Sequence, residues 1–190
     1  MMKHLGTVRL ETQRLILRKA KISDAEDMFK NWASDSRVTK FLIWEPYTNT
    51  EDVRGYISFL LENYKNDNYY YWFIELKETQ EPIGAISVVQ MSEDIESALI
   101  GYCLGYNWWH QGIMTEAFTA VIKFLFEEVG INRIESTHDP NNPNSGKVMK
   151  KCGLRYEGTL RQSGKNNCGI CDSVYYAMLK EDYLKDKKYK

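Results

Sequence analysis

The chain has 190 residues, of which 43% are hydrophobic and 27% charged, as in an ordinary globular domain. This length suits one domain, and the composition excludes intrinsic disorder, collagen and coiled coil. The 25 basic residues face 26 acidic ones, so the chain lacks the positive excess of most nucleic-acid-binding proteins. Its longest apolar run, at 69–74, is too short to span a membrane.

The N-terminal part of the chain predicts a strand and two helices. Residues 7–19 carry apolar residues at strand spacing and are predicted to form an opening strand. Ser23 with Glu26 three places later fits a capping box at the start of a short helix. Thr50 is predicted to cap a second helix, whose apolar stripe runs over 53–64.

Three strands and a long helix are predicted next. The strands cover 69–76, 82–90 and 97–104, and the last two are nearly continuous apolar runs, as in strands buried on both faces. A helix begins after Gly112 and ends near Gly130, a typical C-terminal cap. Its apolar residues recur at helical spacing, which predicts one face packed on the sheet.

The C-terminal part predicts a short strand at 133–138, a helix at 142–151 closed by Gly153, and a hairpin of strands at 154–161 and 173–179. All 190 residues are therefore expected to form a single α/β (α+β) domain with helices laid over one sheet.

The junction at Gly112 is the first feature that points to chemistry. A helix N-terminus presents unpaired N–H groups and partial positive charge, and a glycine there lets a phosphate approach the backbone. The stretch from Gln111 to Thr115 is thus a candidate pyrophosphate cradle. A strand-to-helix turn that needs glycine only for its geometry is the alternative. The stretch matches neither a Walker loop nor G-x-G-x-x-G.

A second feature lies about 30 residues further on. Asn142-Pro143-Asn144-Ser145 opens the predicted helix that Lys151-Cys152-Gly153-Leu154 closes. Taken alone, this segment is a capped helix, with Asn142 as N-cap and Gly153 after the C-cap.

In this order and spacing, the two features resemble motifs of the GNAT superfamily of acetyl-CoA-dependent N-acetyltransferases. The first corresponds to its pyrophosphate-binding motif and the second to the motif that follows. Segments at both ends resemble the ribosomal-protein N-terminal acetyltransferase group. The resemblance covers about residues 8–183 and rests on the stretches 12–18, 44–47, 100–104, 109–117, 142–145, 151–154, 157–161 and 172–182.

The resemblance implies a mixed, mostly antiparallel central sheet flanked by helices. The strands 97–104 and 133–138 would splay apart to form the acetyl-CoA cleft, with direct acetyl transfer and no covalent enzyme intermediate. Three positions depart from the superfamily pattern. Trp109 replaces Arg or Gln, Met114 replaces a small residue, and Leu99 stands where the group often has a glutamate.

The resemblance also implies roles for individual residues. Acetyl-CoA is the expected co-substrate, and no metal is expected. Asn142 would bond the pantetheine arm, and Ser145 would protonate the departing thiolate. Backbone groups would bind the rest of the cofactor: Cys103 and Leu104 the pantetheine, and Gln111, Gly112, Ile113, Met114 and Thr115 the pyrophosphate.

The acceptor amine must be neutral to attack. At pH 7, deprotonation costs about 4.6 kcal/mol for a lysine side chain but only about 1–1.4 kcal/mol for an α-amine. No strong base stands out in the sequence, which favours an α-amine acceptor. Glu45, in the loop that relatives use to shape the acceptor pocket, is the candidate base, with Glu96 and Asp172 behind it. Each is also explained as a solvated surface acid.

Other polar residues are assigned structural roles. Cys168 and Cys171 lack a second ligand pair for zinc and fall at a predicted hairpin tip, so they are expected to be ordinary reduced thiols. His110 is expected to be a variable neighbour of the phosphate loop, because only backbone is required there. His138, at the end of a strand, is expected to be a structural polar residue rather than a proton carrier.

The sequence therefore predicts an N-acetyltransferase acting on a primary amine, above all the N-terminal α-amine of a protein such as a ribosomal protein. A small-amine, polyamine or antibiotic acetyltransferase is one alternative, and the acidic stretch 93–96 would then supply an acidic acceptor pocket. A non-catalytic acyl-CoA-binding regulator is another. No secretory signal is seen in 1–19, so we expect a cytoplasmic monomer or homodimer that contacts neither membrane nor nucleic acid directly.

Overall fold

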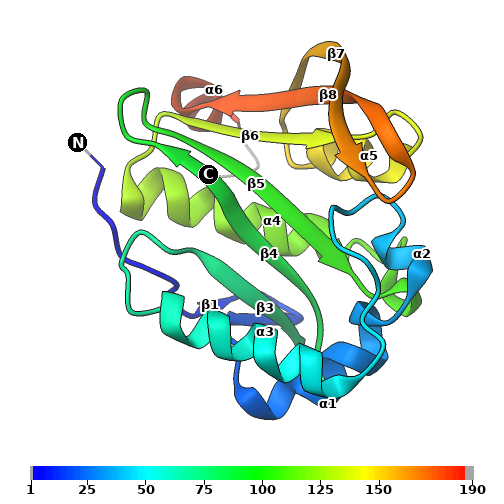
Figure 1. Cartoon of the computed structure of the whole chain (residues 1–190). Helices are drawn as coiled ribbons and strands as arrows, with labels where there is room; N and C mark the ends of the chain where they lie inside the picture. Colours follow the sequence, from blue (N-terminus) through cyan, green and yellow to red (C-terminus); the bar gives the residue numbers. More distant parts are fainter. Residues whose placement is uncertain (1, 187–190) are drawn as a thin grey trace.

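The computed structural model describes residues 2–186 and is built on one eight-stranded sheet with helices on both faces (Figure 1). The strand order is β1-β2-β3-β4-β5-β6-β8-β7. Within residues 2–186, neighbouring strands run antiparallel except for β5 and β6, which are parallel. The mixed, mostly antiparallel sheet expected from the sequence is confirmed.

The strands are β1 (Leu10–Glu11), β2 (Leu15–Arg18), β3 (Tyr71–Leu76), β4 (Glu81–Ser92), β5 (Ser97–Leu104), β6 (Arg133–His138), β7 (Arg155–Asn166) and β8 (Gly169–Leu179). The α-helices are α1 (Ala25–Met28), α2 (Ser36–Thr39), α3 (Thr50–Asn63), α4 (Ile113–Phe124), α5 (Pro143–Lys151) and α6 (Lys180–Lys185). Short 3-10 or π turns cover Ile22–Asp24, Phe29–Ala33, Tyr106–Trp108 and Leu125–Val129. No helix in this part of the chain combines the length and apolar character needed to cross a bilayer.

The sheet separates two hydrophobic cores, as the alternation of side chains along strands requires. Trp72 and Phe118 belong to the core on the α4 side, and Trp32, Ile57 and Phe73 to the core under α1 and α3. All five side chains are at most 1% exposed. The neighbours Trp72 and Phe73 therefore point to opposite faces, so β3 is buried on both sides and anchors both helix layers.

Two N-terminal predictions are wrong in detail. Residues 7–19 form a short hairpin of β1 and β2 rather than one strand, because the chain turns where Thr12 N–H donates to the Leu15 carbonyl (3.0 Å). The next helix is not capped by Ser23 and Glu26. Instead, the carboxylate of Asp24 accepts a hydrogen bond from Lys21 N–H (2.7 Å).

The cap of α3 also differs from the prediction. Asn49, not Thr50, is the N-cap, and its side-chain oxygen accepts from Asp52 N–H (2.9 Å). Both residue types cap helices well, so composition alone does not choose between neighbours.

The β7–β8 hairpin is longer than predicted. Its strands continue to Asn166 and Gly169, which pair directly across a two-residue turn. Most of β7 is exposed, so it lacks the apolar alternation by which a half-buried strand is recognised. The hairpin tip itself falls where the sequence placed it.

The strands β5 and β6 part after a short stretch of pairing. Their register begins at Ser97 with Arg133 and ends at Leu99 with Glu135. One further link is the hydroxyl of Ser136, which donates to the Ile100 carbonyl (2.8 Å). The carboxyl-terminal halves of the two strands diverge, which confirms the splayed strands expected from the sequence.

Candidate functional site

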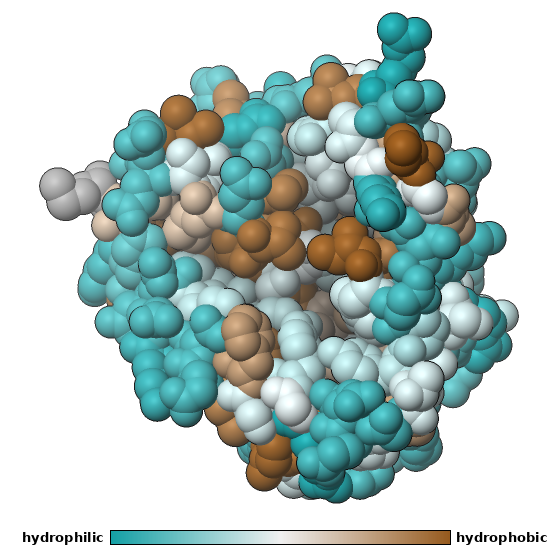
Figure 2. Space-filling view, in the orientation of Figure 1, coloured by the Kyte–Doolittle hydropathy of each residue, from teal (hydrophilic) through white to brown (hydrophobic). Residues whose placement is uncertain are grey.

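A cavity of about 250 Å³ lies beside the diverging ends of β5 and β6. In the orientation of Figure 1, the surface is hollowed near its centre, with hydrophobic side chains around the hollow (Figure 2). The cavity is bordered by the residues after α2, the end of β5, the start of α4 and the first two turns of α5. Its lining consists of Val38, Phe41, Leu42, Tyr102, Cys103, Leu104, Trp108, Trp109, His110, Gly112, Ile113, Met114, Thr115, Asn142, Asn144, Ser145, Lys147, Val148 and Lys151.

Eight of the ten residues predicted to bind acetyl-CoA or to act first in catalysis, the latter being Ser145 and Glu45, lie in this lining. They are Cys103, Leu104, Gly112, Ile113, Met114, Thr115, Asn142 and Ser145. The other two, Gln111 and Glu45, are exposed and lie outside it. The fold thus gathers segments that are some 40 residues apart in the chain around one cavity.

The first turn of α4 supplies backbone donors to this cavity. Gly112 is the N-cap, and its left-handed backbone (φ 75°) is one that glycine adopts without strain. The Glu116 N–H donates to the Gly112 carbonyl (3.0 Å). The N–H groups of Ile113, Met114 and Thr115 precede that bond and have no acceptor within the helix. Such a helix start attracts a negatively charged group such as a phosphate.

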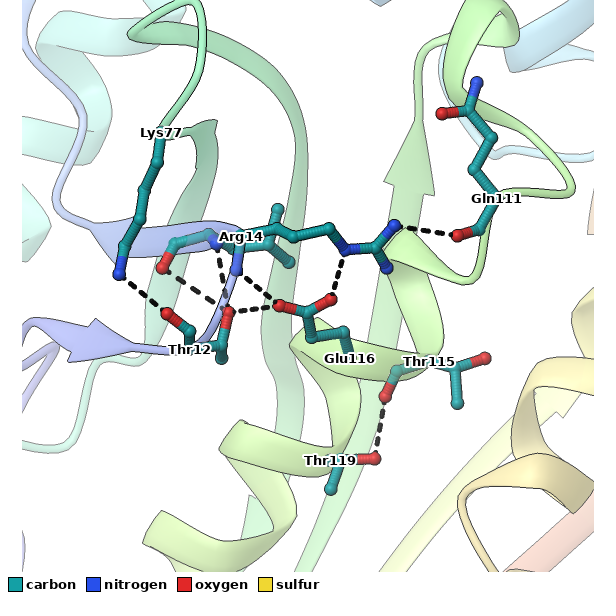
Figure 3. A network of polar contacts seen from close by, with 8 residues as sticks. Thr12, Arg14, Lys77, Gln111, Thr115, Glu116 and Thr119 are labelled. Atoms are coloured by element: carbon teal, nitrogen blue, oxygen red, sulfur yellow. Dashed lines mark hydrogen bonds and ion pairs between the residues drawn. The ribbon is translucent and has the colours of Figure 1, made fainter.

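An acidic residue in the same turn does not oppose an anion, because its charge is neutralised. Glu116 accepts hydrogen bonds from the Arg14 guanidinium Nε (2.7 Å), the Arg14 backbone N–H (2.9 Å) and the Thr12 hydroxyl (2.6 Å) (Figure 3). Burial alone would raise the pKa of Glu116, but the bonds from Thr12 and Arg14 outweigh it and lower the pKa. The Glu116 carboxylate is therefore paired with Arg14, in the turn before β2, and lies outside the cavity lining.

Arg14 also reaches the loop in front of α4. Its Nη1 donates to the Gln111 carbonyl (3.1 Å), as Figure 3 shows, while the Gln111 side chain donates to the Asn107 carbonyl (2.8 Å). These bonds hold the carbonyl and the side chain of Gln111 outside the cavity lining, and they fix the loop that precedes α4. Sequence reasoning missed this brace. Arg14 and Glu116 both stand in the recognised motifs, but nothing in a single sequence pairs two residues so far apart.

Two residues of the cavity lining, Tyr102 and Ser145, are joined through their hydroxyl groups. The Ser145 hydroxyl donates to Tyr102 Oη (2.9 Å), and the Tyr102 hydroxyl donates to the Ser145 carbonyl (2.9 Å). Burial raises the pKa of Tyr102, so its phenol is neutral and protonated at physiological pH. This arrangement can supply a proton but cannot act as a strong base. Tyr102 had no assigned role in the sequence prediction.

The thiol of Cys103 is unsuited to nucleophilic attack. Burial raises its pKa to about 12. At pH 7 only about one thiol in 100,000 would then be ionised, and the thiolate is the nucleophilic form. This agrees with a reaction that proceeds without an acyl-cysteine intermediate.

The first turns of α5 add polar and positive groups. The Asn142 side chain makes no capping bond with the helix, although the residue is the N-cap. Its backbone N–H donates to the Asp139 carbonyl (2.8 Å). Lys147 and Lys151, one helical turn apart, line the cavity and make its α5 wall positive. Sequence reasoning gave these lysines no role, although their spacing on the predicted helix was readable.

The candidate bases lie outside the cavity lining. Glu45 is exposed. Glu96 lies in the β4–β5 turn, where its carbonyl accepts from Asn132 N–H (2.8 Å). Asp172 accepts from Gln162 N–H (2.9 Å). Glu93 contacts His4 (3.3 Å). The acidic stretch 93–96 therefore lies before β5, whereas the cavity lies at the other end of that strand.

The remaining polar residues are also placed. His110 lines the cavity, whereas His138 packs over Tyr176 (ring centroids 5.8 Å apart) and against Gly146, where a Cβ would come within 2.5 Å of its Nε2. Cys168 and Cys171 are free thiols on the β7–β8 hairpin. Among residues 2–186, no group of three or more His, Cys, Asp or Glu is placed to hold a metal ion.

Comparison with known proteins identifies the family of this chain. The family profile described as acetyltransferase (GNAT) domain matches residues 14–155, about three quarters of the chain. An uncharacterised N-acetyltransferase, p20 of Bacillus licheniformis, is 32% identical over 92% of this chain and 97% of its own length. The [ribosomal protein uS5]-alanine N-acetyltransferase of Escherichia coli is 26% identical over 80% of each chain.

Solved structures share the architecture. A GNAT-family acetyltransferase from Bacillus anthracis superposes with a TM-score of 0.79 at 27% identity, over 92% of this chain and 99% of the other. The cavity beside the splayed strands, the helix start with free N–H groups and the family profile agree with one another. The chain belongs to the GNAT family and is an acetyl-CoA-dependent N-acetyltransferase.

Proposed function

We propose that this enzyme acetylates the N-terminal α-amine of a protein, and that a ribosomal protein is its substrate. One observation carries the proposal: among the described residues that line the cavity, none is an aspartate or a glutamate. A polyamine carries several positive charges and needs acidic groups for recognition, and a lysine acceptor needs a base strong enough to deprotonate it. An α-amine needs neither.

The likeness to a named relative supports the same substrate class. The Escherichia coli relative, 26% identical over 80% of each chain, is named for acetylating an alanine of ribosomal protein uS5. The acidic stretch 93–96, which would have served a polyamine site, lies at the far end of β5 from the cavity. Glu45 also lies outside the lining, so water is the simplest carrier for the proton that the α-ammonium group must lose before its nitrogen attacks.

The lining residues fit acetyl-CoA in chemical terms. The N–H groups of Gly112 to Thr115 would bind the pyrophosphate, and the positive α5 wall would face its phosphates. Backbone groups of Cys103 and Leu104 and the side chain of Asn142 would hold the pantetheine. In the reaction, the amine nitrogen bonds to the acetyl carbon and the carbon–sulfur bond breaks. Ser145, hydrogen-bonded to Tyr102, would give its proton to the leaving thiolate and regain one, through water, from the nitrogen that becomes the amide.

The test is one reaction of the protein with acetyl-CoA, a library of hexapeptides that differ in their first two residues, and spermidine, followed by mass spectrometry. We expect acetyl groups on peptide α-amines, with the first residues defining the preference. The same mixture with the Gly112→Glu variant gives the background from non-enzymatic acetylation. Acetylated spermidine with unmodified peptides would overturn the proposal and favour a small-amine enzyme. No product at all, with acetyl-CoA still bound, would favour a regulator.

A further inference from the structure

The tip of the β7–β8 hairpin, Asn166 to Gly169, contacts the segment Thr39–Trp44 that follows α2. In Figure 1 the end of this hairpin lies beside that loop. The Asn167 side chain donates to the carbonyls of Thr39 (2.9 Å) and Trp44 (2.8 Å). Its backbone N–H donates to the Leu42 carbonyl (3.1 Å). One residue thus supplies three hydrogen bonds to a loop more than 120 positions earlier in the chain.

The same tip is also bonded to the turn before α5. The Asn166 side chain, in a residue only 8% exposed, donates to Asp139 Oδ2 (2.8 Å) and accepts from Cys168 N–H (2.8 Å). The other carboxylate oxygen of Asp139 accepts from Asn141 N–H (2.8 Å), and its carbonyl accepts from Asn142 N–H (2.8 Å). Adjacent asparagines therefore join the turn that carries Asn142 to the loop that carries Phe41 and Leu42.

The Thr39–Trp44 segment depends on such outside bonds. It begins at the last residue of the four-residue helix α2 and contains no strand. Phe41 and Leu42 line the cavity, whereas the Ile43 between Leu42 and Trp44 is 86% exposed. A loop with few regular backbone bonds and an exposed apolar side chain belongs to the less stable parts of a protein. The bonds from Asn167 replace those that a neighbouring strand would give.

We propose that Asn167 is a positioning residue that fixes the Phe41–Leu42 wall of the cavity and thereby determines which amines are accepted. The proposal rests on the proposed function for its reference to an acceptor amine. Phe41 and Leu42 line the cavity from a segment separate from α4 and α5, whose residues fit the cofactor. Holding that segment in a fixed position relative to the Asn142 turn limits the size of the amine that the cavity admits.

Two substitutions separate the side-chain bonds from the bulk of the residue. Asn167→Ala removes both side-chain donors, and Asn167→Asp keeps the size but places acceptor oxygen against the Thr39 and Trp44 carbonyls. Lys165→Ala, at an exposed position of the same hairpin, is the matched control. None of these positions lines the cavity.

The first readout is hydrogen exchange, which requires no acceptor. We expect amides of 38–47 to exchange about tenfold faster in Asn167→Ala and faster still in Asn167→Asp, with α4 unchanged in both and the control like wild type. The Kd for acetyl-CoA should stay within about twofold, because the cofactor end is braced elsewhere. Unchanged exchange of 38–47 in both variants would overturn the proposal.

The second readout uses the hexapeptide library with acetyl-CoA. For the preferred peptide, we expect KM to rise about tenfold in Asn167→Ala while kcat changes less, and the preference among first residues to flatten. Faster exchange with an unchanged preference would overturn the assignment of specificity to Asn167. If the wild-type enzyme acetylates no peptide, the proposed function fails, whereas the exchange result still decides whether Asn167 holds the loop.

Discussion

The two ends of the cleft are both held by a side chain from a distant element, but they are built differently. At the cofactor end, Arg14 binds the Gln111 carbonyl behind a twelve-residue helix whose first N–H groups face the cavity. At the other end, Asn167 binds the Leu42 and Trp44 carbonyls of a loop. The first brace stabilises an already regular element, whereas the second supplies three hydrogen bonds to a segment that has little regular structure of its own.

This difference explains what each end can recognise. A helix start binds phosphate through backbone N–H groups, so its side chains can vary, as Trp109 and Met114 do here. The loop at the other end offers Phe41 and Leu42, which select by shape and apolar contact. The cofactor end is therefore common to a family, and the other end can differ between members with different substrates.

The largest effect should come from filling the phosphate site. Gly112→Glu places a carboxylate and a side chain with strained backbone at the start of α4, and the Kd for acetyl-CoA should rise about 100-fold or more. Gly130→Glu is the control, because Gly130 has a similar backbone (φ 80°) and open space but lies beyond the other end of this helix. Titration calorimetry with acetyl-CoA gives both values. Equal losses in the two variants would assign the effect to strain and charge rather than to phosphate.

The next largest effect concerns Ser145 and its partner Tyr102. Ser145→Ala removes the proposed proton donor, and kcat should fall roughly 30-fold while the Kd for acetyl-CoA changes less than about twofold. Tyr102→Phe leaves the Ser145 hydroxyl in place but removes its partner, so a smaller fall is expected. Steady-state kinetics with the preferred peptide measures both. An unchanged kcat in Ser145→Ala would remove this serine from the reaction.

Breaking the brace behind α4 should have an intermediate effect. Arg14→Ala frees the Gln111 carbonyl and leaves the Glu116 carboxylate unpaired near the bound phosphates, so the Kd for acetyl-CoA should rise about tenfold. Adding Glu116→Gln should recover part of this loss. Arg9→Ala, which breaks an exposed pair with Glu11, should change little. A Kd that is equally raised in the single and double variants would mean that the charge of Glu116 does not matter.

The sequence predicted the regular parts of this molecule well. Both β5 and β6 have the predicted bounds, and α4 with its final turn lies between Gly112 and Gly130 as expected. The strand β5 is a nearly continuous apolar run, and α4 carries an apolar stripe with a glycine at each end. In these two segments the pattern follows from burial against the sheet and is visible along the sequence, whereas β6 has only one apolar residue, Ile134.

The braces could not be predicted, because they depend on contacts between distant segments. The opening segment was expected as one strand because its apolar residues fit that spacing, yet the bond across Thr12 turns the chain and brings Arg14 to α4. The hairpin tip was located from Asn167-Cys168 and its neighbours, but its contact with Trp44 has no signature in the order of residues. When a side chain donates to a backbone carbonyl, the sequence does not identify the partner, because every residue has a backbone carbonyl.

The smallest predicted effect is a pH dependence of the free energy of unfolding, which differs between the two ends of the cleft. Each end contains one carboxylate whose pKa is lowered in the fold, although burial alone would raise it. Bonds from Thr12 and Arg14 do this for Glu116, and bonds from Asn141 and Asn166 for Asp139. The folded protein therefore binds fewer protons than the unfolded chain near pH 4, where such carboxyl groups titrate when exposed.

The stabilisation from both carboxylates is therefore complete at neutral pH and is lost as the pH falls through their folded pKa values. The free energy of unfolding is measured with urea at several pH values. The difference between wild type and the Glu116→Gln variant should narrow from pH 7 toward pH 3.5, and so should the difference between wild type and Asp139→Asn. The gap for Glu116 should be the larger one, because its partner is a cation and that of Asp139 is an amide. Glu62→Gln, on the exposed surface of α3, is the control for net charge. If its gap narrows as much, the pH dependence belongs to the whole surface and not to the two ends of the cleft.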